Sequence, residues 1–177
     1  KKNANKIETY ELYKKEIFIA VFGRIGKNLI KRCLGFDMKV NVFDPFIDES
    51  NIKSYGGNKV DNLQTAIKTS DFVSIHMPLN EKTRNLIDAK ILKTMKSNAI
   101  IINTARGGIV NEVDLDNALK SKIIYAAGLD VFEKEPPDSN NPLLKNKNVL
   151  LSPHSATFTN ECKSRMSVET VQTVSYT

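Results

Sequence analysis

Residues 19–26 read IAVFGRIG, where an apolar run passes into a turn with two glycines. An apolar strand, a glycine turn and a helix in this order begin a dinucleotide-binding unit, whose fingerprint is G-x-G-x-x-G. Gly23 and Gly26 stand at the second and third glycine positions, and Val21 stands at the first. The stretch predicts the start of an α/β fold. The loop itself could be a working cofactor site, a damaged one or a coincidence of two glycines.

Apolar runs and helix-like patterns alternate along the rest of the chain. Strands are expected at residues 17–22, 39–43, 72–76, 99–102, 123–129 and 149–151, and helices at 25–34, 62–68, 89–96, 112–120 and from about 159. Strands that are apolar throughout and separated by helices indicate a parallel sheet covered on both faces. The predicted fold class is a Rossmann-type doubly wound α/β domain, whose ligands bind beyond the carboxyl ends of the strands.

The composition argues against several kinds of partner. The net charge of +6 comes from 21 lysines and 5 arginines spread along the sequence, without the clustered basic patch that binds nucleic acid. No apolar run approaches the roughly 20 residues that a membrane span needs. Cys33 and Cys162 stand alone, so neither a metal knuckle nor a disulfide framework is expected. These features favour a cytoplasmic protein that binds neither nucleic acid nor membranes and holds no metal.

The glycine turn and the end of the next strand form the first candidate site. Gly23 would let the backbone approach a pyrophosphate, and the free N–H groups at the start of the helix would face the phosphates. The candidate phosphate contacts are Gly23, Arg24, Ile25 and Gly26. Asp44 follows Gly26 by 18 residues, close to where a carboxylate takes the adenosine ribose hydroxyls and repels a 2′-phosphate. This arrangement predicts NAD as the cofactor, although Asp44 could also be a turn residue before Pro45.

Three further clusters follow strands: NTARGGIVNE (103–112), GLDVFEKEPP (128–137) and LSPHSAT (151–157). In the first, Arg106 suits a carboxylate, which a guanidinium holds in two parallel hydrogen bonds; its alternative role is to cap a neighbouring loop or form a salt bridge with it. In the second, three acids precede two prolines and could form a solvated loop: Asp130, Glu133 and Glu135. In the third, His154 lies among small residues that leave room for a substrate, although a lone histidine is more often structural.

These residue types fit one reaction. Hydride transfer to a 2-oxo acid needs a cation for the carboxylate, a proton donor for the forming alkoxide, and a group that tunes the donor. Arg106, His154 and an acid near His154 would supply these parts. A carboxylate beside the imidazole would fix its tautomer and favour its protonated form.

Five motifs in order resemble the NAD-binding domain of the D-isomer-specific 2-hydroxyacid dehydrogenases. They are FGRIGKNLIKRCLGFDMKVNVFDP (22–45), HMPLNEKTRNLI (76–87), NTARGGIVNE (103–112), AAGLDVFEKEPP (126–137) and SPHSAT (152–157). The resemblance implies interconversion of a D-2-hydroxy acid and its 2-oxo acid with NAD. Family members that act on glyoxylate, hydroxypyruvate or D-lactate share these motifs, and members usually dimerise through this domain.

The resemblance also implies individual roles. Arg106 would bind the substrate carboxylate, His154 would be the acid and base, and Glu135 would pair with the histidine. Asp130 would contact the nicotinamide carboxamide. The other implied cofactor contacts are Thr104 and Ala105 at the nicotinamide, His76 and Pro78 along the cofactor, and Thr83 near its phosphates.

The sequence departs from the family pattern in two main ways. Val21 stands where the family has glycine, and the family's separate substrate domain is not represented. We therefore expect residues 1–16 to be a lead-in from that domain, residues 17–158 to be the NAD-binding domain, and residues 159–177 to begin a C-terminal helix that is cut short. Such a domain alone would bind NAD but would convert substrate slowly. Asp37, where glycine is common, is a smaller change because Asp tolerates unusual backbone angles. The rival interpretation is a non-catalytic NAD(H)-binding module or relic.

Overall fold

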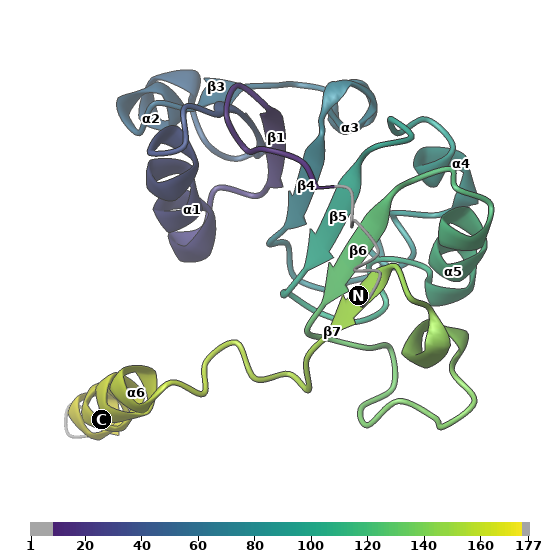
Figure 1. The fold of residues 1–177 in the computed structure, drawn as a ribbon. Helices are drawn as coiled ribbons and strands as arrows, with labels where there is room; N and C mark the ends of the chain where they lie inside the picture. The colour runs from purple at the N-terminus through teal and green to yellow at the C-terminus, as the bar shows by residue number, and fades with distance from the viewer. Residues whose placement is uncertain (1–8, 175–177) are drawn as a thin grey trace, which may run out of the picture.

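The protein is described by a computed structural model that covers residues 9–174, and its centre is a parallel sheet (Figure 1). Within these residues the sheet has seven strands in the order β3-β2-β1-β4-β5-β6-β7. The strands are β1 (Glu16–Ala20), β2 (Lys39–Phe43), β3 (Asn58–Lys59), β4 (Phe72–Ile75), β5 (Ile100–Asn103), β6 (Ala126–Leu129) and β7 (Val149–Leu151). The order reverses between β1 and β4, which confirms the predicted doubly wound class.

The helices follow the predicted pattern with local differences. They are α1 (Arg24–Leu34), α2 (Glu49–Ser54), α3 (Leu63–Thr69), α4 (Ala89–Leu92), α5 (Glu112–Lys120) and α6 (Asn160–Val174), with a 3-10 turn η1 (Pro142–Lys145). The sequence pattern did not predict α2, β3 or η1, which are short and carry little periodicity. The helix expected at 89–96 is only one turn long, and the strand expected from residue 123 begins at Ala126.

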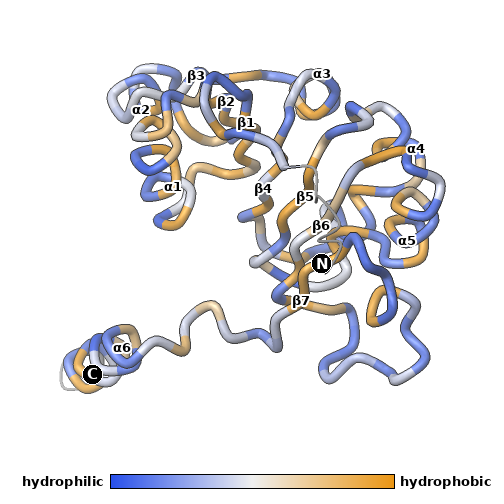
Figure 2. The backbone as a smooth tube through the Cα atoms, in the orientation of Figure 1, coloured by the Kyte–Doolittle hydropathy of each residue, from blue (hydrophilic) through white to orange (hydrophobic). Residues whose placement is uncertain are grey.

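The alternation of side chains along β1 explains the two layers of the core. Phe18 and Ala20 pack on one face with residues of α3, α4 and α5, whereas Ile17 and Ile19 pack on the other face with residues of α1 and α2. Successive residues of a strand point to opposite faces, so an apolar strand covered on both faces is apolar at every position. Figure 2 shows the resulting hydrophobic strands in orange.

The helix α1 ends at Leu34, as expected, and the turn after it contains a left-handed residue. Gly35 is the C-cap residue, but its φ of −64° is right-handed. The left-handed residue is Asp37, with φ 55°, two positions later. The backbone N–H of Asp37 donates to the carbonyl of Leu34 at 2.9 Å. A short polar side chain tolerates this conformation better than most residues do, as expected for Asp37.

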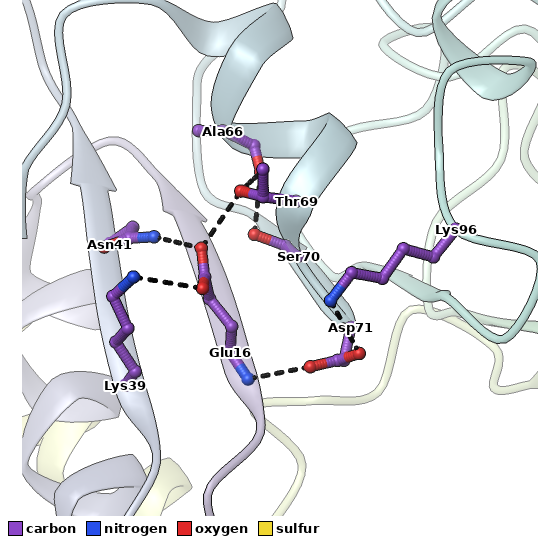
Figure 3. A network of polar contacts seen from close by, with 8 residues as sticks. All are labelled: Glu16, Lys39, Asn41, Ala66, Thr69, Ser70, Asp71 and Lys96. Atoms are coloured by element: carbon purple, nitrogen blue, oxygen red, sulfur yellow. Dashed lines mark hydrogen bonds and ion pairs between the residues drawn. The ribbon is translucent and has the colours of Figure 1, made fainter.

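A polar network joins the amino ends of three strands (Figure 3). The Glu16 carboxylate on β1 accepts hydrogen bonds from Lys39 Nζ at 3.1 Å, Asn41 Nδ2 at 2.5 Å and Thr69 Oγ1 at 3.0 Å. Asp71, just before β4, accepts from the backbone N–H of Glu16 at 2.9 Å and from Lys96 Nζ at 3.0 Å. These contacts fix the strand edge opposite the carboxyl ends, where ligands bind in this class of fold.

The final helix lies apart from the sheet. Residues 152–159 lead away from β7, and α6 stands at the end of this connection (Figure 1). Its side chains at residues 160–172 are exposed apart from the half-buried Cys162. No helix in the part of the chain that the structure describes is long and apolar enough to cross a membrane.

Candidate active site

Buried polar side chains mark the carboxyl ends of three strands. Asp44, Asn103 and Asp130 end β2, β5 and β6 and are 6%, 2% and 3% exposed. A polar group this deeply buried must form hydrogen bonds, because desolvation without a partner is costly. Each of these three side chains forms hydrogen bonds with backbone groups of nearby loops. The loops at the ligand-binding edge are therefore held by the sheet itself.

The glycine turn carries a strained residue. Val21 has φ 84°, in the region that glycine adopts freely and a β-branched residue does not. The extended strand therefore ends at Ala20, two residues before its predicted end at Phe22. The carbonyl oxygen of Val21 lies so close to Gly26 that a Cβ there would overlap it. Gly26 is thus required for close packing of α1 on the sheet.

The start of α1 fits a dinucleotide pyrophosphate. Gly23 is its N-cap and provides no side-chain cap, and the first turn contains no acidic residue. The first N–H groups of a helix have no partners within the helix and attract anions. A Cβ built on Gly23 would have nothing within 4 Å, so the space beside it is open. These features leave room and donors for a phosphate group near Arg24 and Ile25.

Asp44 is held more tightly than the sequence indicated. Its Oδ2 accepts the backbone N–H of Phe22 at 3.0 Å, and its Oδ1 accepts the backbone N–H of Phe46 at 2.9 Å. The carboxylate thus fixes the glycine turn to the end of β2. Each carboxylate oxygen has a second lone pair, so the predicted contact with ribose hydroxyls stays available to Asp44.

The loop after β4 carries three of the predicted cofactor residues. His76 Nε2 lies 2.9 Å from Ser74 Oγ, and burial lowers the pKa of His76, which keeps its ring neutral. The Thr83 hydroxyl donates to the carbonyl of Pro78 at 2.7 Å and accepts the backbone N–H of Asn80 at 2.8 Å. Thr83 therefore shapes this loop.

Arg106 lies on an exposed loop held by Asn103. The Asn103 side chain accepts the backbone N–H of Ala105 at 3.1 Å and donates to the carbonyl of Arg106 at 2.9 Å. The Arg106 guanidinium forms no ion pair within the described residues; its Nη1 donates to the carbonyl of Ala105 at 2.6 Å. Of the two alternative roles, the structure shows a hydrogen bond to a loop carbonyl and, within the described residues, no salt bridge. Thr104, beside Asn103, is half-buried.

The Arg106 loop packs against the acidic loop that follows β6. A Cβ on Gly107 would overlap the carbonyl of Phe132, so only glycine permits this approach. Glu133 points away from the histidine, because it forms an ion pair with Arg84 at 3.1 Å and its N–H bonds to Glu112 at 2.6 Å. Of the three acids in this loop, Glu133 is therefore the one that forms an ion pair with Arg84.

Glu135 and His154 form a hydrogen-bonded pair. His154 Nδ1 lies 2.6 Å from Glu135 Oε2, and Glu135 Oε1 accepts the backbone N–H of Phe132 at 3.0 Å. The bond from His154 is the main cause that lowers the pKa of Glu135, and the bond from Phe132 adds to it. An ionised Glu135 places the proton on Nδ1 and leaves Nε2 free to exchange a proton with a substrate.

Asp130 holds the loop that carries His154. Its Oδ1 accepts from Ser152 Oγ at 2.5 Å and from the backbone N–H of Ser155 at 2.9 Å, and its Oδ2 accepts from the N–H of Ala156 at 3.0 Å. Burial raises the pKa of Asp130, but these hydrogen bonds outweigh it and leave the pKa below its ordinary value. The ionised carboxylate thus satisfies three donors of one loop.

An apolar pocket of about 410 Å³ adjoins the His154–Glu135 pair. Its other walls come from the acidic loop, η1 and the end of β7: Phe132, Pro136, Pro137, Leu144, Leu151, Ser152 and Pro153. Concave apolar surfaces with a few polar groups are typical binding sites. Residue patterns alone did not single out this pocket, nor Asn103 and Glu112, although a polar residue ending the run IIIN is a signal for Asn103. The described residues contain no group of side chains suited to hold a metal ion.

The fold and the site together define an NAD-binding domain of an oxidoreductase family. Residues 1–156 match the family model described as D-isomer specific 2-hydroxyacid dehydrogenase, NAD binding domain, and the chain belongs to this family. A D-lactate dehydrogenase of Aquifex aeolicus, solved with NAD and lactic acid, is 30% identical, with a TM-score of 0.87 over 96% of this chain and 55% of that one.

Proteins related to this chain in sequence are named for different 2-hydroxy-acid or 2-oxo-acid substrates. A glyoxylate reductase of Thermococcus litoralis is 45% identical over 157 residues, which are 89% of this chain and 47% of that protein. A D-3-phosphoglycerate dehydrogenase of Methanocaldococcus jannaschii is 43% identical over 153 residues, 86% of this chain and 29% of the relative. A hydroxypyruvate reductase of Thermotoga maritima is 40% identical over 166 residues, 93% of this chain and 53% of the relative. The chain thus spans about half or less of the length of these relatives.

Proposed function

We propose that the protein interconverts a D-2-hydroxy acid and its 2-oxo acid with NAD. The observation that carries this proposal is the 2.6 Å contact between His154 Nδ1 and Glu135 Oε2, beside a loop that presents an exposed arginine. A domain that only bound the dinucleotide would need neither an oriented imidazole nor an exposed guanidinium that forms no ion pair within residues 9–174. The non-catalytic interpretation is therefore the second candidate, and the strained Val21 is the observation in its favour.

Each residue has a proposed part in the reaction. Arg106 holds the substrate carboxylate in two parallel hydrogen bonds and orients the carbonyl. His154 donates a proton to the forming alkoxide, or accepts the hydroxyl proton in the oxidation direction. Glu135 fixes the orientation and tautomer of the imidazole through the bond to Nδ1. The start of α1 and Asp44 would hold the dinucleotide at its pyrophosphate and ribose, and NAD(H) bound there would supply or accept the hydride.

The substrate proposed first is D-3-phosphoglycerate. The 43% identity to a dehydrogenase named for it supports this choice. Glyoxylate and hydroxypyruvate are the alternatives, because reductases named for them are 45% and 40% identical. D-lactate is a further alternative. We also propose a homodimer, which light scattering would test directly.

Two measurements test the function. NADH is first titrated against this chain by its own fluorescence, which is free of tryptophan background because the chain has no Trp. The full-length protein is then assayed with NADH and 3-phosphohydroxypyruvate, hydroxypyruvate, glyoxylate or pyruvate. Binding together with turnover of one of these acids is the expected result. Binding without turnover of any of them would favour the non-catalytic module.

Replacement of the proposed acid and base separates chemistry from binding. His154→Ala should lower kcat about 10²–10⁴-fold, the usual contribution of a positioned proton donor, while the Kd for NADH changes little. Equal losses in turnover and in NADH affinity would instead assign His154 a structural role.

A further inference from the structure

Two neighbouring buried side chains hold the two loops on which the proposed chemistry depends. Asn103 ends β5 and bonds to the backbone of Ala105 and Arg106. Asp130 follows β6 and bonds to Ser152, to the N–H of Ser155 and to the third donor of that loop, the N–H of Ala156. Neither side chain needs solvent to satisfy its polar atoms. Both therefore act on backbone that carries a proposed functional residue.

The two side chains are linked through the sheet. The backbone N–H of Asp130 donates to the carbonyl of Asn103 at 3.0 Å. This bond continues the parallel ladder of β5 and β6, in which Asn103 is paired with Leu129. This backbone hydrogen bond thus joins Asn103, which holds the Arg106 loop, directly to Asp130, which holds the His154 loop.

The backbone at His154 explains why its loop needs a clamp. His154 has φ 51°, a left-handed conformation that is unfavourable for most residues other than glycine. Such a conformation persists only where the surrounding contacts hold it. Asp130 supplies these contacts on both sides, through Ser152 before the histidine and through Ser155 after it.

We propose that Asn103 and Asp130 are a pair of positioning residues that set the Arg106 guanidinium and the His154 imidazole in register for one substrate. The inference rests on the proposed function of those two residues. It also gives Asp130 a role other than the contact with the nicotinamide carboxamide implied by the family resemblance. The Asp130 carboxylate accepts three hydrogen bonds from the histidine loop, so it holds that loop whether or not its remaining lone pair contacts a cofactor.

The test uses the small number of histidines. The sequence contains two, His76 and His154, so imidazole NMR spectra of the labelled chain contain two sets of signals. Asp130→Asn keeps the volume and removes one acceptor. We expect the His154 signals to shift and the low-field proton of the bond to Glu135 to weaken, while the His76 signals stay in place. The Kd for NADH should change less than threefold.

Further variants address each loop separately. Ser152→Ala removes one donor to Asp130 and should shift the His154 signals in the same direction by a smaller amount. Asn103→Asp keeps the acceptor for Ala105 and loses the donor to Arg106, so the Arg106 Nε signal should shift. In the full-length protein, Asp130→Asn should lower kcat roughly 100-fold, as misplacement of a reacting group by about 1 Å does.

The control is a buried amide at the opposite edge of the sheet. Asn41 is 6% exposed and bonds to Glu16 (Figure 3). Asn41→Ser should lower stability and leave the His154 signals and NADH affinity unchanged. A tenfold loss of NADH affinity in Asp130→Asn with unmoved His154 signals would overturn the proposal and make Asp130 a cofactor contact. Unmoved His154 signals in both Asp130→Asn and Ser152→Ala would overturn it as well. Absence of turnover in the unmodified full-length protein would contradict the proposed function and leave this spectroscopic result intact.

Discussion

The backbone N–H of Phe22 donates to Oδ2 of Asp44 at 3.0 Å. This bond joins the turn after β1 to the residue after β2, so the proposed ribose carboxylate also supports the turn that approaches the pyrophosphate. Val21, directly before Phe22, keeps its positive φ within this supported turn. The strain at Val21 is therefore held by contacts at the cofactor edge of the sheet, where it bears on cofactor affinity.

Replacement of Val21 by glycine should relieve that strain. A β-branched residue at positive φ stores on the order of 1–3 kcal/mol. Where this strain falls on the cofactor-bound state, Val21→Gly should tighten NADH binding by about tenfold or more. Titration by NADH fluorescence measures the effect. Asp37→Gly is the matched control, because Asp37 also has positive φ (55°) but lies in the turn before β2, at the amino edge. It should leave the Kd unchanged. An unchanged Kd in Val21→Gly would mean that the free protein carries the same strain.

Two glycines at the ligand edge should respond oppositely to alanine. Gly23 has φ −76° and ψ −172°, which alanine adopts readily, and a Cβ there contacts nothing within 4 Å. Gly23→Ala should keep the unfolding temperature and raise the Kd for NADH at least tenfold, because the methyl group fills the proposed pyrophosphate space. Gly107→Ala should lower stability by about 2 kcal/mol or more, since its Cβ would overlap the carbonyl of Phe132. Unaltered NADH affinity in Gly23→Ala would contradict the proposed phosphate position.

The charge at Arg106 should matter less than its shape. Arg106→Lys keeps the positive charge but loses the planar fork that binds a carboxylate at two points. In the full-length protein we expect KM for the 2-oxo acid to rise about tenfold, the loss of one charge-assisted hydrogen bond, while the Kd for NADH stays constant. A parallel loss of NADH affinity would place Arg106 at the cofactor instead of the substrate.

Lowering the pH should remove the contribution of Asp71 to the free energy of unfolding. Burial raises the pKa of Asp71, but the bonds from the Glu16 N–H and from Lys96 outweigh it and leave the pKa below the ordinary value. Because the folded pKa is the lower one, the unfolded chain takes up the proton first as the pH falls. Asp71→Asn should therefore lower the free energy of unfolding by about 1–3 kcal/mol above pH 5, and the difference should vanish as the pH falls through the folded pKa.

Urea unfolding of both proteins between pH 6 and pH 3 would measure this difference. A difference that is constant with pH would contradict the assignment. Affinity for NADH should be the same in both proteins, because Asp71 lies at the amino edge of the sheet (Figure 3).

The sequence by itself determined the class of fold. It also indicated that the candidate site residues follow strands and therefore lie at one edge of the sheet. Continuous apolar runs such as residues 17–22 must be buried on both faces, and helices between them require a parallel sheet. Residues that follow such strands, Arg106 and His154 among them, therefore come to the same edge. An unusual backbone conformation at Asp37 was also expected, because Asp tolerates it where glycine is common; the positive φ of Val21 was established only by the structure.

Only the tertiary structure decided which polar groups meet. From residue types alone, Glu133 and Glu135 were equivalent acids in one loop, yet Glu133 pairs with Arg84 and Glu135 with His154. Asp130 holds the histidine loop across 25 residues of sequence, and Asn103 holds the arginine loop. Hydrogen bonds between loops depend on where the sheet places strand ends that are distant along the chain. No local periodicity encodes that placement.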